Sequence, residues 1–316
     1  MTGKKTVGKF IEYIFIRVWD FQLMCIPFRL RAWMTEQIGI ALYHIFGKYR
    51  RLVLAHLEQA FPDSKPEWRV KIAKQNFRNM GRLMGEINQT PRLNDKFFKK
   101  WMVIKPGMRE HIDAFEGSRI QILGHLGNWE WHGFVGSHLI KKPVYTLVKR
   151  HTNFWSNGYL ERTRNSAGMR LIYVDQNPFI VVKRLRAGDS VAFTSDQDAR
   201  GNGEFFPFFN KPASTFTGPA VVARNAPDAK VFFIWSYHDE KKRLVFDCEP
   251  LEMPRVPRDD MDAWEHEFTH IWVKKLEEKI RAHPADYLWA HNRWKTQPDD
   301  VPAFWKRFGG GPSAPK

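Results

Sequence analysis

Short β-rich segments that alternate with helical segments in the central part of the chain constrain the fold most. Strands alternating with helices of this length predict an α/β fold whose mainly parallel central sheet is flanked by helices. The predicted strands are IQIL (120–123), VYTLV (144–148), RLIYV (170–174) and SVAFTS (190–195). The predicted helices between them lie near 129–140, 153–167 and 177–187.

The remaining segments complete the predicted order. Residues 10 to about 100 have helical periodicity, and the clearest example is 66–87, where apolar residues recur every three or four positions. Near the other end, 230–238 and 243–249 flank a charged DEKK turn and predict an antiparallel hairpin, followed by a helix over 260–282. We predict membrane-associating helices over 1–50, one catalytic domain over 51–308 and a disordered tail over 309–316.

The segment from Phe10 to Phe28 has apolar residues at helical spacing. Its opposite side carries Glu12, Arg17, Asp20 and Gln22, which argues against a helix that crosses the bilayer. No small-residue cleavage site of a signal peptide follows. Nine lysines and arginines against three acids in residues 1–52 give a net charge of +6. This pattern predicts an amphipathic helix on an anionic membrane surface, and a helix packed on the protein's own core is the alternative.

The chain has a formal net charge of +16 over 316 residues, and therefore requires an anionic partner or surface. Nucleic acid, anionic lipid and an acidic carrier protein all qualify. Neither zinc-finger spacing nor the signature of an RNA-recognition module is present, which disfavours nucleic acid. The two cysteines, Cys25 and Cys248, lie in apolar surroundings and predict neither a disulfide nor a cysteine-based zinc site.

The stretch GHLGNWEWHG (124–133) follows the first predicted strand, at the sheet edge where ligands bind in parallel sheets. His125 can take a proton from a hydroxyl that attacks a carbonyl, and Glu130 can orient the imidazole. Gly124 and Gly127 permit a tight backbone path. The stretch contains no Ser or Cys nucleophile, so direct transfer without a covalent acyl-enzyme is expected. An aromatic-rich piece of core is the alternative.

Further candidates lie at predicted strand ends and helix starts. Asp196 and Asp198 follow the strand at 190–195, so they are expected at the same sheet edge as His125. Thr217, together with Ser214 and Thr215, is a candidate cap of a helix whose free N–H groups suit phosphate or an oxyanion. The predicted substrate-binding residues are Asn128, Arg150, Arg164, Asp196, Asp198 and Thr217.

The segment HEFTH (266–270) matches the H-E-x-x-H pattern of zinc peptidases. Its predicted helix is heavily charged, and no suitably spaced third ligand follows. A metalloprotease is therefore disfavoured, and neither a metal nor a cofactor is expected.

These residues resemble the lysophospholipid acyltransferase superfamily, specifically the late acyltransferases of bacterial lipid A biosynthesis. GHLGNWE resembles the family's H-x4-E motif. The similarity continues through residues 54–86, through SDQDARGNGEFFPFFNKPASTFTGPAVVARNAP and through YLWAHNRWKTQP. Asn210 and Asn292 depart from the family pattern, standing where a glycine and a basic residue are frequent.

The resemblance implies a membrane-bound enzyme with a glycerolipid acyltransferase-like α/β body at the cytoplasmic face of the bacterial inner membrane. It implies transfer of an acyl chain from acyl carrier protein, or from CoA, to a hydroxyl of a phosphorylated lipid A precursor. His125 is then the general base and Glu130 its partner, while Arg164, Asp196 and Asp198 line the site. Two alternatives stay open: acylation of another lipid, such as a phosphatidylinositol mannoside, a lysophospholipid or an aminolipid, and non-catalytic binding of anionic membrane or nucleic acid.

Overall fold

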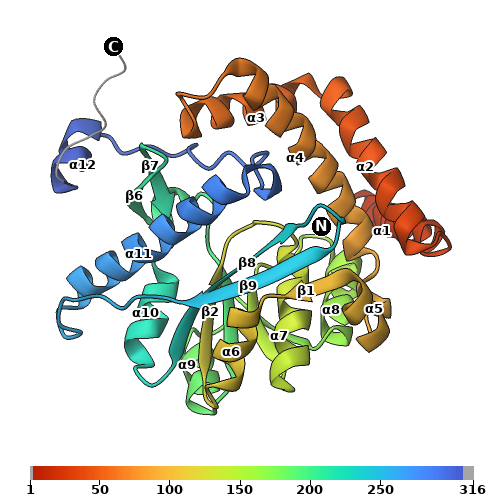
Figure 1. The fold of residues 1–316 in the computed structure, drawn as a ribbon. Coiled ribbons are helices and arrows are strands. Elements are labelled where there is room, and N and C mark those ends of the chain that lie inside the picture. The colour runs from red at the N-terminus through yellow and green to blue at the C-terminus, as the bar shows by residue number, and fades with distance from the viewer. Residues whose placement is uncertain (1–2, 309–316) are drawn as a thin grey trace.

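The computed structural model describes residues 3–308, and the predicted tail at 309–316 lies outside the described residues. The chain begins with four helices that stand beside the α/β body (Figure 1). They are α1 (Gly3–Met24), α2 (Phe28–Ile45), α3 (Gly47–Ala60) and α4 (Pro66–Ile87). The helix predicted over 66–87 is confirmed. Among the described residues, no helix has the length and apolar character that crossing a bilayer requires.

A seven-stranded sheet forms the centre of the body, in the order β1-β9-β8-β2-β5-β3-β4. The four predicted parallel strands are confirmed as neighbours within it, and β8 pairs parallel to β2 on their other side. The predicted hairpin is confirmed as the antiparallel pair β8 and β9. The strands are β1 (Met102–Ile104), β2 (Arg119–Leu123), β3 (Val144–Val148), β4 (Met169–Tyr173), β5 (Ser190–Thr194), β8 (Lys230–His238) and β9 (Leu244–Pro250).

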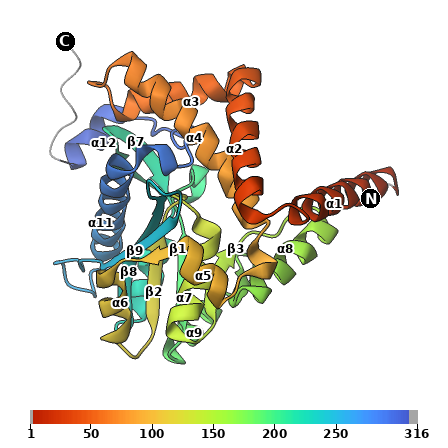
Figure 2. The same cartoon turned by 45° about the vertical axis from the view of Figure 1, so that its right-hand side comes forward.

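Helices cover both faces of the sheet (Figures 1 and 2). Because side chains alternate along a strand, Ile120 and Ile122 face one buried cluster while Leu123 faces the other. On the first face lie α9 (Phe179–Arg186), α10 (Gly218–Asn225) and α11 (Met261–Ala282). On the second lie α5 (Asp95–Trp101), α6 (Pro106–Asp113) and α7 (His132–Ile140). The helix α8 (Phe154–Ser166) packs on β4 and α1, and α12 (Val301–Arg307) ends the described chain.

A second, two-stranded sheet was not predicted. It pairs β6 (Glu204–Phe208) with β7 (Lys211–Thr215) in antiparallel fashion. The two residues between the strands, Phe209 and Asn210, have φ angles of 48° and 58°. Positive φ at both central residues is typical of a tight hairpin turn, in which asparagine and glycine are both favoured. This conformation accounts for the asparagine at 210.

Helices α2 and α4 are in direct backbone contact through glycines. A Cβ at Gly39 would lie 2.1 Å from the Phe77 carbonyl oxygen, and a Cβ at Gly81 would lie 2.2 Å from the Thr35 carbonyl oxygen. Their two backbones therefore touch directly, and no larger residue fits between them. Residues of both helices line an apolar groove.

Candidate active site

His125 lies immediately beyond β2, where a short loop leads into the 3-10 turn η2 (Trp129–Trp131) and α7. The neighbouring strand β5 pairs with β2 so that Leu123 is opposite Thr194, which brings Asp196 beside His125. The Asp196 carboxylate accepts the backbone N–H of His125 at 2.9 Å and lies 2.6 Å from the imidazole Nδ1. The expectation that Asp196 shares a sheet edge with His125 is confirmed.

Burial and charge act against each other in this pair. Burial lowers the pKa of His125, but the Asp196 carboxylate, aided by Glu130, outweighs it and holds that pKa above its usual value. Burial raises the pKa of Asp196, but His125 and Arg293 outweigh it and hold that pKa below its usual value. Asp196 is therefore ionised near neutral pH. With Nδ1–H donated to Asp196, the imidazole presents Nε2 as its basic atom, and the Gln197 amide nitrogen lies 3.4 Å from it.

The loop of residues 124–128, which we call the His125 turn, packs tightly against β8. Gly127 has a φ of +66°, and a Cβ there would lie 2.1 Å from the Ser236 carbonyl oxygen. A glycine is thus required by both conformation and space. The turn also forms an antiparallel bridge in which the Gly127 N–H donates to the Asp286 carbonyl and the Leu288 N–H donates to the His125 carbonyl, both at 3.0 Å.

Glu130 lies on η2, and its carboxylate accepts two hydrogen bonds from Arg164 of α8, at 2.9 and 2.7 Å. Burial lowers the pKa of Arg164, but Glu130 outweighs it and raises that pKa. The sequence motif assigned to Glu130 the contact that orients the imidazole. In the structure Asp196 makes that contact, because it approaches Nδ1 from the adjacent strand while Arg164 holds Glu130 to one side. Glu130 acts on His125 through charge.

The other predicted binding residues have different surroundings. Asn128 is fully buried; its amide nitrogen donates to Glu86 at 3.0 Å and its amide oxygen accepts the Trp131 N–H. Its side chain supports the His125 turn rather than facing an open site. Asp198 lies close by, where it accepts the Thr296 hydroxyl at 3.0 Å, and its N–H donates to the ring Nε2 of His291.

Arg150 and Thr217 are not joined to this group by the contacts that the structure shows. Arg150 is exposed, donates to Asp175 at 2.9 Å and lies over the ring of Tyr173. Thr217 precedes α10, as expected for a cap, but its side chain makes no capping hydrogen bond.

The structure adds two residues from the C-terminal segment. Arg293 is 2% exposed, and its charge lowers the pKa of Asp196. Tyr287 is buried beside Asp196, and burial together with that carboxylate raises its pKa well above 10. Both lie in the YLWAHNRWKTQP stretch, whose resemblance to the family signature was the one sign in the sequence that they belong to the site.

An apolar groove of about 500 Å³ opens beside His125. It reaches the site through Trp129, whose ring centroid lies 4.9 Å from that of the imidazole. The other lining residues come mainly from the N-terminal helices and the segment after α11, and they include Trp19, Leu23, Ile38, Leu42, Phe46, Phe77, Met80, Met84, Leu288 and Ala290. A hydrocarbon chain fits such a lining, which adjoins the histidine at Trp129.

The H-E-x-x-H match lies on α11, away from this group. His266 contacts the Glu204 carboxylate at 3.1 Å, and the rings of His266 and His270 both pack against Phe308.

A mainly parallel sheet that carries a histidine–carboxylate pair at its ligand-binding edge, next to an apolar groove, is typical of an enzyme that acts on an apolar substrate. Residues 4–296 match the family model of the bacterial lipid A biosynthesis acyltransferases, and the chain belongs to that family. It is accordingly an O-acyltransferase, and membership supports acyl transfer to lipid A.

Proteins named as lipid A acyltransferases are similar to this chain along most of their length. The chain is 25% identical over 281 residues to the lipid A biosynthesis palmitoleoyltransferase of Escherichia coli K12, covering 86% of this chain and 87% of the relative. It is 26% identical over 289 residues to the lipid A biosynthesis lauroyltransferase of the same organism, covering 84% and 85%. A lipid A biosynthesis acyltransferase of Haemophilus influenzae is 24% identical over 306 residues, covering 90% of each chain.

Proposed function

We propose that the protein transfers a fatty acyl chain from an acyl thioester, carried by acyl carrier protein or CoA, to a hydroxyl group of a lipid A precursor. The observation that carries this proposal is the position of His125, which is held by Asp196 and lies against Trp129 of the groove lining. The groove takes the acyl chain, and the thioester carbonyl then lies next to Nε2.

In the proposed reaction, His125 Nε2 takes the proton of the acceptor hydroxyl while the oxygen forms a bond to the thioester carbonyl carbon. The carbon–sulfur bond of the resulting tetrahedral intermediate breaks, and the departing thiolate takes the proton from Nε2. Asp196 holds Nδ1–H and stabilises the imidazolium between these steps, and Glu130 adds a second negative charge. The acyl group passes directly to the acceptor, and no acyl-enzyme forms.

The net charge of +16 suits both partners, since carrier proteins of this kind are acidic and the proposed acceptor is phosphorylated. Arg164 holds the Glu130 carboxylate with two hydrogen bonds and is the proposed site cation for an anionic substrate group. Nucleic acid is not a proposed partner.

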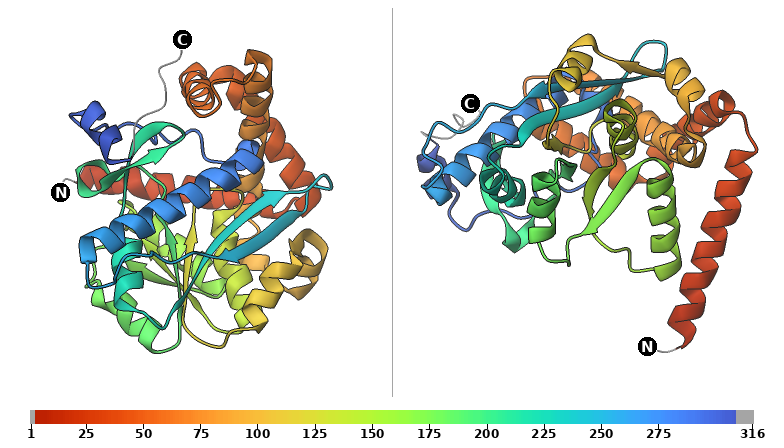
Figure 3. Two further views of the ribbon diagram at one scale, coloured as in Figure 1. Left: turned by 60° about the vertical axis from the view of Figure 1, so that its left-hand side comes forward. Right: turned by 90° about the horizontal axis from the view of Figure 1, so that it is seen from below.

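The proposed location is the inner membrane, with the α/β body on its cytoplasmic face. Helix α1 projects from the body and touches it along one side only (Figures 2 and 3). On that side Phe10 packs on Trp155 of α8, and Lys9 donates to the Thr152 carbonyl. The apolar residues on the remaining surface of α1 are exposed, among them Val7, Ile11, Ile14, Phe15, Val18 and Phe21. Exposed apolar residues grouped in this way fit a helix that lies in a bilayer surface.

Replacing three of these residues together, Ile11→Ser, Phe15→Ser and Val18→Ser, is expected to release the full-length protein from anionic vesicles in a sedimentation assay. Their exposed fractions are 62%, 71% and 50%, so the body loses little packing. A matched control replaces Phe179 and Val174, which are exposed to 75% and 59% on the α/β body. Equal sedimentation of both variants would show that α1 does not anchor the protein.

Lipid mass spectrometry of a deletion strain and its complemented parent tests the proposed function as a whole. We expect the deletion to remove one acyl chain from lipid A and complementation to restore it, and the mass difference names the chain. If the deletion removed an acyl chain from another lipid class instead, that lipid would be the acceptor and the lipid A proposal would be wrong. Unchanged lipids, together with no transfer by the purified protein from either thioester donor, would refute acyl transfer.

A further inference from the structure

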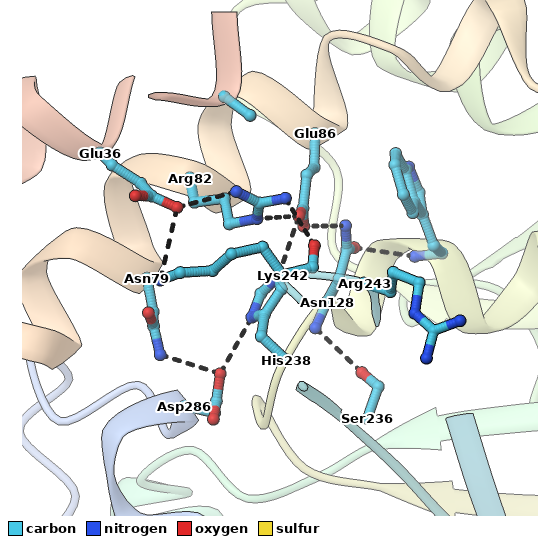
Figure 4. Close-up of polar contacts among 12 residues, drawn as sticks. Glu36, Asn79, Arg82, Glu86, Asn128, Ser236, His238, Lys242, Arg243 and Asp286 are labelled. Carbon is cyan, nitrogen blue, oxygen red and sulfur yellow. Dashed lines mark hydrogen bonds and ion pairs between the residues drawn. The ribbon is translucent and has the colours of Figure 1, made fainter. Parts of the chain in front are cut away.

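A buried cluster of charged side chains lies behind the His125 turn (Figure 4). Its centre is Glu86 of α4, which is 1% exposed. Oε1 of Glu86 accepts the Arg82 Nε–H and lies against Nε2 of His238, both at 2.9 Å. The outer members are Glu36 of α2, which accepts from Arg82 at 2.8 Å, and Asp286, which lies 3.1 Å from Nδ1 of His238.

The geometry requires His238 to be a cation, because each of its ring nitrogens faces a carboxylate and carboxylates only accept hydrogen bonds. Lys242 adds a third positive charge, 3.8 Å from Glu36. The cluster then balances, with three cations (Arg82, His238 and Lys242) against three anions (Glu36, Glu86 and Asp286). Loss of the His238 proton would leave one uncompensated negative charge in a buried region.

Hydrogen bonds from three segments connect this cluster and its immediate neighbours to the His125 turn. The free oxygen of Glu86, Oε2, accepts the Asn128 side-chain N–H at 3.0 Å. The backbone carbonyl of Asp286 accepts the Gly127 N–H at 3.0 Å. Ser236, two residues before His238 on β8, accepts the Asn128 backbone N–H at 3.0 Å (Figure 4). The cluster thus contacts the turn from α4, from the segment after α11 and from β8.

Stability alone is a poor explanation for such a cluster, because buried ion pairs are often replaceable by apolar residues without loss of stability. The same helix α4 lines the groove with Phe77, Met80 and Met84. Glu86 therefore joins the groove wall to the turn that carries the base. We infer that Glu86 and His238 are positioning residues, which through Asn128 hold His125 at the correct place relative to the groove. This inference rests on the proposed function.

The inference predicts a pH dependence that a passive cluster would not give. Burial lowers the pKa of His238, but Glu86 and Asp286 outweigh it and raise that pKa to about 9. The other charged or titratable groups that face the cluster are Arg82 from α4, Glu36 from α2, Lys242 from the β8–β9 connection and His283 at the end of α11. Because the cluster balances only while His238 is protonated, kcat is expected to fall as pH rises through about 9.

The test uses the full-length protein in detergent micelles, with a lauroyl thioester and a lipid A precursor as substrates. Asn128→Ser keeps a side-chain oxygen of the kind that caps η2 and loses the amide N–H group that donates to Glu86. We expect kcat to fall about tenfold with KM unchanged. His238→Gln is expected to lower kcat similarly and to abolish the alkaline fall near pH 9. Arg224→Gln, which opens the half-buried pair with Glu265 between α10 and α11, is the control and should keep both kcat and the pH profile.

Wild-type kcat and an unchanged alkaline limb in both folded variants would overturn the inference. If His238→Gln fails to fold, as near-ultraviolet circular dichroism would show, Asn128→Ser decides alone. The two proposals can fail separately. No transfer by the wild-type protein refutes the proposed function, whereas an active wild type and an inactive His125→Ala beside fully active cluster variants refute the positioning role only.

Discussion

A His125→Ala variant is expected to lose about 10²- to 10⁴-fold in kcat while its KM for the acyl donor changes little. Nδ1 of His125 faces Asp196, so Nε2 is the ring atom proposed to take the proton, and the imidazole does not line the groove itself. The rate is measured with the purified protein, a lauroyl thioester on either carrier and a lipid A precursor. His138→Ala is the control, because His138 lies on α7 and contacts Asp95 on the surface.

The same experiment examines the absence of an acyl-enzyme. When the wild-type protein is incubated with donor alone, its intact mass is expected to stay unchanged. Full activity of His125→Ala would refute the general-base mechanism, and an added acyl mass on the wild type would refute direct transfer.

Replacing Asp196 by asparagine is expected to lower kcat by about 10²- to 10⁴-fold as well, because an amide at this position no longer fixes the imidazole with its proton on Nδ1. The pH profile separates this effect from simple misfolding. Burial lowers the pKa of His125, but Asp196 outweighs it and raises that pKa above its usual 6.5. Under the proposed mechanism only the neutral imidazole acts as the base, so wild-type kcat is expected to rise with pH through that raised pKa. In Asp196→Asn the pKa of His125 falls. The remaining activity then increases with pH over a lower pH range than in the wild type.

Glu130→Gln is the matched comparison for this variant. Glu130 reaches His125 through charge alone, and its carboxylate is already held by Arg164. We therefore expect a smaller loss than for Asp196→Asn. A larger loss for Glu130→Gln would restore Glu130 as the acid that orients the base, as the H-x4-E spacing alone suggested.

Much of the fold follows from local sequence patterns. The strands after residue 118 are β-rich runs bounded by helical segments, and the parallel sheet, the hairpin and the helix over 66–87 are all confirmed. The strand β1 spans only Met102–Ile104 and is too short for any periodicity. The hairpin of β6 and β7 was missed because its turn begins with Phe209, a bulky residue that rarely adopts a positive φ.

The sequence predicted the site contacts that form between the ends of neighbouring strands. It did not predict the contacts that form between segments distant in the sequence. Asp196 follows β5 as His125 follows β2, so their meeting was expected from strand order. The five-residue spacing from His125 indicated Glu130 as a site residue. Its partner Arg164 lies 34 residues away on another helix, where no local pattern indicates the contact. Arg82 and Glu86 have the four-residue spacing of an ordinary surface ion pair on a helix, and only the fold shows that they are buried.

The backbone contact between α2 and α4 limits how this enzyme can diversify. At Gly39 and Gly81 that wall of the groove is main chain, and any side chain there would push the helices apart. Under the proposed function, variants with a different acyl-chain length must then arise at the flexible residues around this contact, such as Leu42, Met80 and Met84. Selection of the acyl-chain length would then change through the side chains that line the groove, while the backbone contact between α2 and α4 stays the same.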